Sequence, residues 1–154
     1  MNNLIINKKP RTYIPQDLKM EWDSLSPILD ELLKREIHNV EELEHWLKDK
    51  SELEAALEEN FAWRYIKMSC DTANEDLVKD FQYFATEIEP KISPLANELN
   101  KKFNDNPFID QLDQDKYFVY IRAVKKSLEL YREENVELFT QLQVAQQKYQ
   151  SITG

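Results

Sequence analysis

The chain has 154 residues, which is enough for one domain with a hydrophobic core. Its 29 acidic residues outnumber its 20 lysines and arginines, and the net charge of −9 argues against general binding to nucleic-acid phosphates or anionic membranes. The one glycine is Gly154, so the glycine-rich loops that cradle phosphates and dinucleotides are excluded. The one cysteine, Cys70, cannot form an internal disulfide and favours a reducing compartment.

Long periodic segments rich in Glu, Leu and Lys predict an all-α fold, a bundle of long antiparallel amphipathic helices. Residues 1–23 are predicted to be an irregular N-terminal arm because Pro10 and Pro15 resist helix formation, and residues 24–154 are predicted to be the helical domain. No apolar run approaches the roughly 18 residues that span a bilayer. Leu4-Ile5-Ile6 is too short for the core of a signal peptide, and these absences together favour the cytoplasm.

The first helix is predicted to begin at Ser26, a good N-cap before Pro27, and to end near Glu36. The second is predicted to begin after Asn39, with Glu42 in a capping-box position. Ser51 is another possible start, so a break near residue 50 is the alternative. The apolar stripe of this segment has helical spacing and consists of Val40, Leu43, Trp46, Leu47, Leu53, Leu57, Phe61, Tyr65 and Met68.

The single cysteine is predicted to lie at a turn between two helices. Thr72 and Glu75 match the Thr-x-x-Glu capping box, so the third helix is predicted to begin just after Cys70. The carboxylates of Asp71 and Glu75 would raise the pKa of the thiol, which disfavours a nucleophile. We therefore predict a structural cysteine. The aromatic residues before it are predicted to be core, namely Phe61, Trp63 and Tyr65.

The third segment has the clearest apolar stripe. It consists of Leu77, Phe81, Phe84, Ile88, Ile92, Leu95, Leu99 and Phe103. This stripe stays in phase across Pro90 and Pro94, which predicts one long helix with a kink near Glu89–Pro94, because each proline removes a backbone hydrogen bond. The alternative is two helices, the second of them capped by Ser93.

A short turn or helix is predicted over Phe108–Leu112, and a last helix from Gln114 toward Tyr149. Asn135 interrupts the stripe of this helix and is predicted to mark a polar contact. The stripe itself consists of Tyr117, Ile121, Val124, Leu128, Tyr131, Leu138, Leu142 and Ala145.

Motifs for metal binding and catalysis are not matched. His38 and His45 do not form His-Glu-x-x-His, which places two imidazoles on one metal, and the reversed motif would need a histidine in place of Glu41. Glu87 and Glu89 are two residues apart, so they point to different helix faces and make a poor acid–base pair. We therefore predict no catalytic, cofactor-binding or metal-binding residue in this chain. A cavity walled by the kinked helix is the alternative.

Two charged clusters were also considered. Residues 105–116 are rich in carboxylates, but a calcium loop from Asp113 would need glycine and glutamate where Phe118 and Val124 stand, so a solvated loop is preferred. A local basic patch is the other, and solvated helix faces are preferred to it. That patch would consist of Lys101, Lys102, Lys116, Arg122, Lys125 and Lys126.

A family resemblance lies in residues 65–103, YIKMSCDTANEDLVKDFQYFATEIEPKISPLANELNKKF. This stretch resembles the N-terminal helical region of the oligoendopeptidase F group, within the thimet-oligopeptidase-like family of zinc metallopeptidases. The likeness rests on the Met68–Thr72 turn, the Glu89–Leu95 kink and the Asn100–Phe103 ending. Residues 11–25 and 120–149 resemble the same family, so the resemblance covers nearly the whole chain.

Members of that family are much longer, and their zinc-binding His-Glu-x-x-His helix lies downstream of the matched region. The resemblance implies an N-terminal segment of a cytoplasmic zinc oligopeptidase, which walls the channel for short peptides and lacks the zinc site. Zinc is expected in the full-length parent and none in this chain. The oligopeptide substrate is expected to engage the missing C-terminal portion.

Neither nucleic acid nor membrane is an expected partner, and exposed apolar faces are expected to allow self-association. The glutamate-rich face of the second helix could bias the channel toward cationic peptides, although a solvated face is the preferred interpretation. The alternative function is a stand-alone helical scaffold or adaptor that binds a partner helix.

Overall fold

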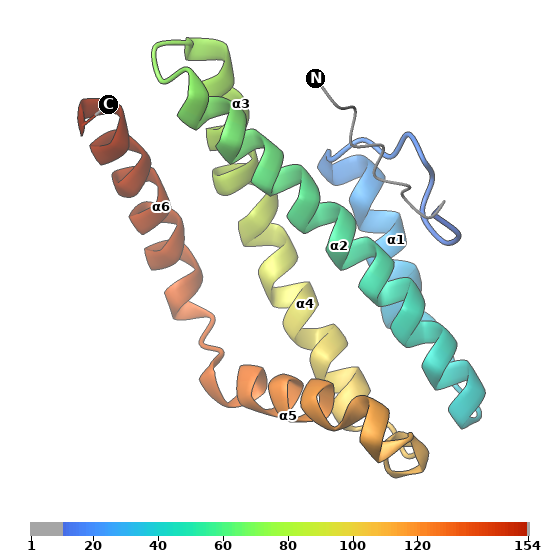
Figure 1. Ribbon diagram of the computed structural model, residues 1–154. Coiled ribbons are helices and arrows are strands. Elements are labelled where there is room, and N and C mark those ends of the chain that lie inside the picture. Colours follow the sequence, from blue (N-terminus) through green and yellow to red (C-terminus); the bar gives the residue numbers. More distant parts are fainter. Residues whose placement is uncertain (1–10, 154) are drawn as a thin grey trace.

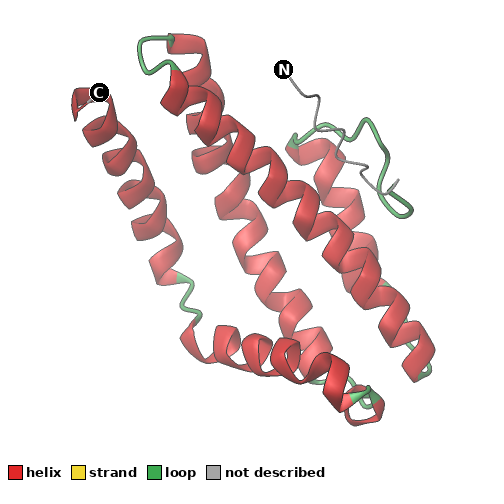
Figure 2. Cartoon of the chain, viewed as in Figure 1, coloured by secondary structure: helices red, strands yellow, loops and turns green. Residues whose placement is uncertain are grey.

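The computed structural model describes residues 11–153, and this part of the chain is helical, with no strand (Figure 2). Residues 1–10 of the predicted arm and Gly154 lie outside the described residues. The prediction of an all-α fold is confirmed. The helices are α1 (Trp22–Lys34), α2 (Val40–Cys70), α3 (Glu75–Tyr83), the π-helical turn η1 (Phe84–Ile88), α4 (Glu89–Asn104), the 3₁₀ turn η2 (Ile109–Gln111), α5 (Gln114–Leu130) and α6 (Glu134–Thr153).

The helices form an antiparallel bundle closed at one end by α5 (Figure 1). The chain descends through α1, ascends through α2 and descends again through α3 and α4, while α5 crosses the lower end of the bundle and α6 ascends beside α4. Helix α4 packs against α1, α5 and α6, and α2 packs against α3. None of the described helices is both long and apolar enough to cross a membrane.

Helix α1 begins at Trp22, so the predicted start at Ser26 is wrong, and it ends at Lys34. Pro27 lies inside the helix, where it removes the single bond that its N–H would have donated to the carbonyl of Asp23. Packing outweighs this loss. The apolar face of the helix is fully buried through Leu25, Leu29 and Leu32.

Helix α2 is capped as predicted. Asn39 Oδ1 accepts from the N–H of Glu42 at 2.8 Å, and the Glu42 carboxylate accepts from the N–H of His38 at 2.8 Å. The alternative of a break near residue 50 is wrong, because α2 continues through Lys50, whose side chain is buried against Glu54 and the Tyr120 hydroxyl. Burial alone would lower the pKa of Lys50, but these two partners outweigh it and raise that pKa above its ordinary value.

The turn between α2 and α3 is capped by a different residue from the one predicted. Asn74, and not Thr72, is the N-cap, and its Oδ1 accepts from the N–H groups of Asp76 at 3.1 Å and Leu77 at 3.4 Å. Cys70 is the last residue of α2 and is exposed. Asparagine is at least as good an N-cap as threonine. Asn74 is also nearer than Thr72 to Leu77, where the apolar stripe begins, and the helix starts after Asn74.

The aromatic residues before that turn divide between core and surface. The ring of Phe61 stacks on Phe81 and Phe84, with centroids 5.5 and 5.4 Å apart, as expected of core. Trp63 and Tyr65 are 53% and 40% exposed, so the prediction that they are core is wrong. The stripe remains buried beyond them, because Met68 packs against Phe81 and Ala85.

The third segment is one continuous helical stretch from Glu75 to Asn104, as predicted, but its irregularity is the π turn at Phe84–Ile88. A proline ring crowds the carbonyl four residues earlier, which for Pro90 belongs to Thr86. The π turn changes the helix pitch at that carbonyl, and the N–H of Glu89 accordingly reaches the carbonyl of Phe84. Because α4 runs through residues 93 and 94, the alternative of a second helix capped by Ser93 is wrong.

The predicted last helix is two helices. It breaks after Leu130, where Tyr131 is extended (ψ 131°) and the Arg132 guanidinium donates to the carbonyls of Glu129 and Tyr131 at 3.0 and 2.6 Å. Neither proline nor glycine marks this break. It is set by packing, because α5 lies across the end of the bundle whereas α6 returns along η1 and α4.

Candidate functional site

The residues that could bind zinc do not come together. His38 Nε2 lies 3.5 Å from Glu36 Oε2, with both side chains largely exposed, and Cys70 is at the far end of α2 from both histidines. Over residues 11–153 no three His, Cys, Asp or Glu side chains are placed to hold a metal ion. The resemblance implies zinc only in the longer parent, and the described residues offer no group of ligands for it, so no chemical step through zinc is assigned to them.

Three lysines of the basic patch, to which solvated helix faces were preferred, are engaged in ion pairs. Lys101, Lys116 and Lys126 pair with Glu98, Glu44 and Glu129 at 2.7, 3.0 and 3.1 Å, respectively. Lys102 instead donates to main-chain carbonyls at the end of α1, among them Leu32 at 2.9 Å and Leu33 at 2.7 Å. The Lys101 and Lys126 pairs each lie within one helix, whereas the Lys116 and Lys102 contacts join two helices. Four of the six cations are thus engaged within the fold.

The acidic face of α2 has structural roles. Glu52 accepts from the N–H groups of Thr12, Tyr13 and Ile14 at 2.8–3.0 Å and fixes the arm to α2. Elsewhere on this face Glu44 accepts from the Tyr117 hydroxyl at 2.8 Å. Burial alone would raise the pKa of Glu52, but the three N–H donors outweigh it and lower that pKa below its ordinary value of 4.5.

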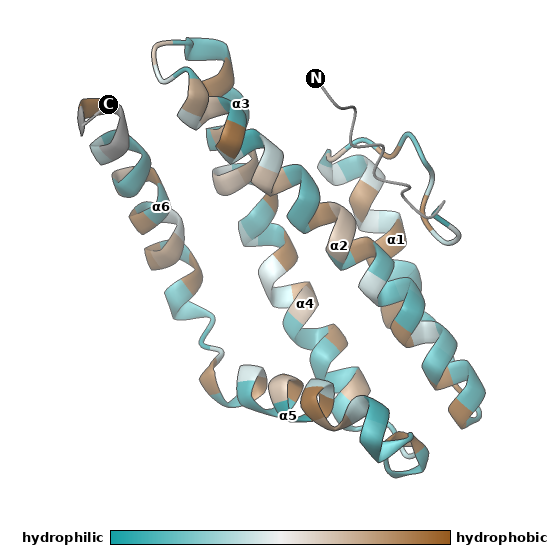
Figure 3. Cartoon of the chain, viewed as in Figure 1, coloured by the Kyte–Doolittle hydropathy of each residue, from teal (hydrophilic) through white to brown (hydrophobic). Residues whose placement is uncertain are grey.

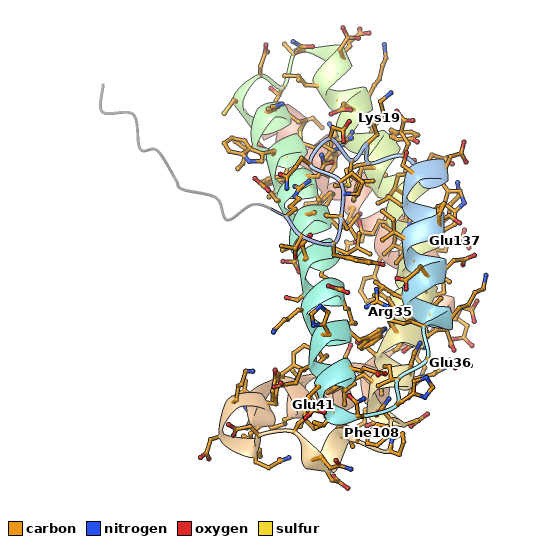
Figure 4. The ribbon with its side chains drawn as sticks, turned by 90° about the vertical axis from the view of Figure 1, so that its right-hand side faces the viewer. Lys19, Arg35, Glu36, Glu41, Phe108 and Glu137 are labelled. Atoms are coloured by element: carbon orange, nitrogen blue, oxygen red, sulfur yellow. The ribbon has the colours of Figure 1, made fainter. Side chains whose placement is uncertain are left out.

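A polar cluster joins the arm, α1 and α2 around Arg35, which Figure 4 labels between these helices. Its guanidinium contacts Asp49 at 2.6 Å and Glu31 at 2.7 Å, and the Tyr13 hydroxyl donates to Glu31 at 2.6 Å. Hydrogen bonds to Glu31 are the largest cause that raises the pKa of Arg35. Every charge in the cluster has a partner within it, so this is a structural joint without a spare group for a ligand.

The remaining predicted carboxylates also have local roles. Asp113 is the N-cap of α5, accepting from the N–H groups of Asp115 at 2.9 Å and Lys116 at 3.3 Å. Glu87 pairs with a lysine one turn later, at 3.7 Å, whereas Glu89 accepts from the Gln143 amide at 3.1 Å. The two glutamates thus point to different partners, as their spacing predicted.

A cavity of about 490 Å³ lies between α4 and the corner where α5 meets α6. Its volume is within the range of roughly 300–1,000 Å³ found for small-ligand sites. Apolar side chains and polar side chains both line it. The lining residues are Pro94, Leu95, Asn97, Glu98, Lys101, Asn104, Asp105, Leu128, Tyr131 and Glu133.

Two polar groups that line this cavity have no hydrogen-bond partner in the described part of the chain. Asn97 is only 8% exposed, and its side-chain amide makes no hydrogen bond there. The Tyr131 hydroxyl is also buried and unpaired. Of the groups that line this cavity, only the Tyr131 hydroxyl is both fully buried and unpaired in the described residues, and leaving such a group unpaired costs roughly 1–3 kcal/mol.

The face of α6 that packs on the bundle is polar. It carries Val136, Thr140, Gln143 and Gln147, spaced as one helix face, and the Gln147 side chain accepts from the Gln82 amide at 3.1 Å. Gln147 is 4% exposed. A second cavity of about 260 Å³ lies along this polar seam and is bounded by Pro90 and residues of α6.

The opposite face of α6 is apolar and exposed. Leu138, Leu142, Tyr149 and Ile152 recur at heptad spacing and are 60–82% exposed, and Ala145 lies on the same face and is exposed. Figure 3 shows brown, apolar positions along the length of α6. Leu138, Leu142 and Ala145 belong to the apolar stripe predicted for the last helix, and this part of the stripe is exposed. Residues 136 and 138 lie about 200° apart around a helix, and the bundle contacts the polar side.

The chain belongs to the Peptidase M3 N-terminal domain family, whose model matches residues 18–131. This match confirms the resemblance to the N-terminal region of a metallopeptidase family, and the described fold carries no metal-binding cluster of its own. The match ends at Tyr131, where α5 ends, so α6 lies outside it. Comparison with curated proteins and with solved structures finds no match.

The cavity at the α5–α6 corner was not predicted from the sequence. Asn97 lies between Leu95 and Leu99 but outside their stripe, so its pattern is that of a solvated residue, whereas tertiary packing leaves it only 8% exposed. Tyr131 was predicted to lie within one last helix. The one available signal was Asn135, which interrupts the predicted stripe four residues after Tyr131.

Proposed function

We propose that this chain is the N-terminal, non-catalytic part of a cytoplasmic zinc oligopeptidase of the oligoendopeptidase F kind, in which it walls the channel that admits short peptides. The observation that carries the proposal is the family match over residues 18–131. In such a parent, zinc bound to downstream residues would activate the water that attacks the peptide carbonyl. This chain would confine the substrate.

The exposed face of α6 supports a role inside a larger assembly. A helix with a heptad-spaced apolar face packs that face against another element in a stable protein, whereas α6 directs it to solvent. We propose that another part of the peptidase covers Leu138, Leu142, Tyr149 and Ile152. In its absence, this face would allow copies of the chain to associate.

The proposal is tested first by the gene and the pure chain. The reading frame downstream of residue 154 is expected to encode a His-Glu-x-x-His segment. The purified chain is expected to bind no zinc stoichiometrically, by elemental analysis after gel filtration, and to cleave no peptide. Stoichiometric zinc together with cleavage that a chelator abolishes would contradict the proposal.

The same exposed face favours the second candidate function, an adaptor that binds a partner helix. Sedimentation of the pure chain measures the self-association that both proposals expect of the exposed α6 face. If the apolar face of α6 mediates self-association, we expect concentration-dependent dimerisation, and we expect Leu142→Gln to weaken it. A stop codon after residue 154, in a gene without an adjoining peptidase, would favour the adaptor over the peptidase domain.

A further inference from the structure

The apolar stripe of α5 continues into α6 without a change of phase. Along α5 the stripe packs against the hydrophobic core and consists of Tyr117, Ile121, Val124 and Leu128. From there, alternating steps of three and four residues lead through residues 131 and 135 to the exposed stripe of α6, which consists of Leu138, Leu142, Ala145, Tyr149 and Ile152. A stripe that keeps one phase lies on one side of a single helix. The break after Leu130 turns the second half of it to solvent.

Helix α6 is attached to the bundle mainly by polar contacts. Neither hydrophobic cluster of the described residues contains a side chain of α6. Hydrogen bonds connect it instead, from Gln82 to Gln147 and from Gln143 to Glu89, both at 3.1 Å. The Oε1 atom of Gln143 is buried without a partner in the described chain, and a cavity of about 260 Å³ lies along the seam. Because hydrogen bonds exchanged with water contribute little net stability, α6 can leave this seam at small cost.

Neither proline nor glycine fixes the bend between the two helices. The connecting residues are Tyr131, Arg132 and Glu133. Tyr131 has φ −62° and ψ 131°, so its φ is already helical and a change of ψ alone brings it into the helical region. The Arg132 guanidinium holds the described, bent form by donating to the carbonyls of Glu129 and Tyr131 at 3.0 and 2.6 Å. In a continuous helix the Glu129 carbonyl would accept from the N–H of Glu133 instead.

We propose that residues 131–133 are a hinge and that the chain has a second, straight form in which residues 114–153 make one continuous helix. In the straight form α6 leaves the seam beside α4 and η1 and projects beyond the end of the bundle, along the direction of α5 (Figure 1). The apolar stripe then runs along one side from Tyr117 to Ile152. The hinge goes beyond the proposed function and does not depend on it, because the stripe, the seam and the connecting residues all lie within the described chain.

The direct test is the distance between two spin labels, measured by double electron–electron resonance at a concentration where sedimentation shows a monomer. The full chain carries Cys70→Ser, and the labels are attached through Asp76→Cys on α3 and Ala145→Cys on α6, at two exposed positions. We expect a short distance from the bent form, in which Gln147 contacts Gln82, and a second, longer distance from the straight form. A single short distance, both here and after the hinge substitution Arg132→Ala, would overturn the proposal.

Two substitutions of Glu134 separate the two forms. Glu134→Pro suits the bent form, because this residue is the first of α6 and proline is favoured there. In the straight form the proline lies inside a helix and crowds the carbonyl of Leu130, so the long-distance population should fall about a hundredfold. Glu134→Ala makes the same change of charge and should keep or enlarge that population. Equal long-distance populations in the two variants would contradict a continuous helix.

Arg132→Ala acts in the opposite direction to Glu134→Pro. It removes the two hydrogen bonds that hold the end of α5 in the bent form, so the long-distance population should rise several-fold. Far-UV circular dichroism should show unchanged or greater helical content. A rise in the long distance together with a loss of helical content would mean that α6 unfolds, and would contradict the hinge.

Thiol reactivity and hydrogen exchange distinguish movement of α6 from its unfolding. In the Cys70→Ser chain, Gln147→Cys and Ala56→Cys place a thiol at positions that are 4% and 3% exposed. We expect iodoacetamide to modify the first roughly tenfold faster or more, because the hinge opens without global unfolding. Equal rates would overturn the proposal. The amides of residues 138–148 should stay protected, because α6 moves as a helix, and exchange as fast as the opening would contradict the straight form.

Discussion

Helices α1 and α6 pack in opposite senses, and α1 is by far the more amphipathic of the two. Helix α1 buries Leu25, Leu29 and Leu32 completely and exposes its charged residues. Helix α6 places Gln143 and Gln147 against the bundle and exposes its leucines.

The difference separates what this chain stabilises by itself from what it presents to something else. The hydrophobic effect drives the larger apolar face of a helix out of water whenever a complementary surface exists. The bundle provides that surface for α1, through α4 and the arm. For α6 it provides only the seam beside η1, so the apolar face of α6 stays exposed in the described residues.

The largest expected effect is on the α1 side of this comparison. Leu29→Ala should lower the free energy of unfolding by about 3 kcal/mol, because it leaves a cavity in a fully buried layer. Urea unfolding followed by circular dichroism measures it. If Leu29→Ala lowers the free energy of unfolding no more than the substitution of an exposed leucine does, Leu29 is not part of a well-packed core.

A smaller effect is expected where the arm is fixed to α2. Glu52→Gln should lower the stability at neutral pH by about 2 kcal/mol, because a charged acceptor of three N–H groups is lost. The folded pKa of Glu52 is below 4.5, so the unfolded chain binds more protons as the pH falls through and below that value. The stabilisation is therefore present above pH 4.5 and lost at lower pH.

This pH dependence is checked by the urea midpoints of the wild type and Glu52→Gln at neutral pH and well below pH 4.5. The difference between the urea midpoints of the two proteins should become smaller in acid. A difference that becomes larger in acid would mean that protonation of Glu52 favours the folded state, contrary to its contacts.

The α2–α3 turn gives a next smaller effect. Asn74→Ala should cost about 1 kcal/mol through the loss of the N-cap, whereas Thr72→Ala should change stability by less than about 0.5 kcal/mol. Thermal unfolding of the two variants compares them directly. A larger loss of stability in Thr72→Ala than in Asn74→Ala would mean that Thr72 is the N-cap.

The smallest effect is expected on α6. Leu142→Ala should change the unfolding free energy of the monomer by less than about 0.5 kcal/mol, because the side chain is 61% exposed. The measurement is made at a concentration where sedimentation shows a monomer. A loss comparable to that of Leu29→Ala would mean that the α6 face is buried in solution, and the comparison between the two helices would fail.

Much of the fold followed from local patterns, while the candidate site did not. The caps at Asn39 and the stripe of the third segment predicted helices correctly, because a cap and a periodic apolar face act over one or a few turns. The break at Tyr131 is marked locally only by Asn135, with neither proline nor glycine, and the cavity lined by Asn97 depends on that break. A site made by the meeting of three helices is invisible to a pattern that describes one.

The sequence by itself determined the all-α class, the continuity of residues 75–104 across two prolines, and the family, because these depend on composition, periodicity and the order of segments. Only the tertiary structure decided which face of each helix is inside. An amphipathic sequence shows that a helix has one apolar and one polar face. Which of these faces packs against the bundle depends on the surface that the rest of the chain supplies. For α1 that surface is apolar, and for α6 it is a polar seam with a cavity at its end.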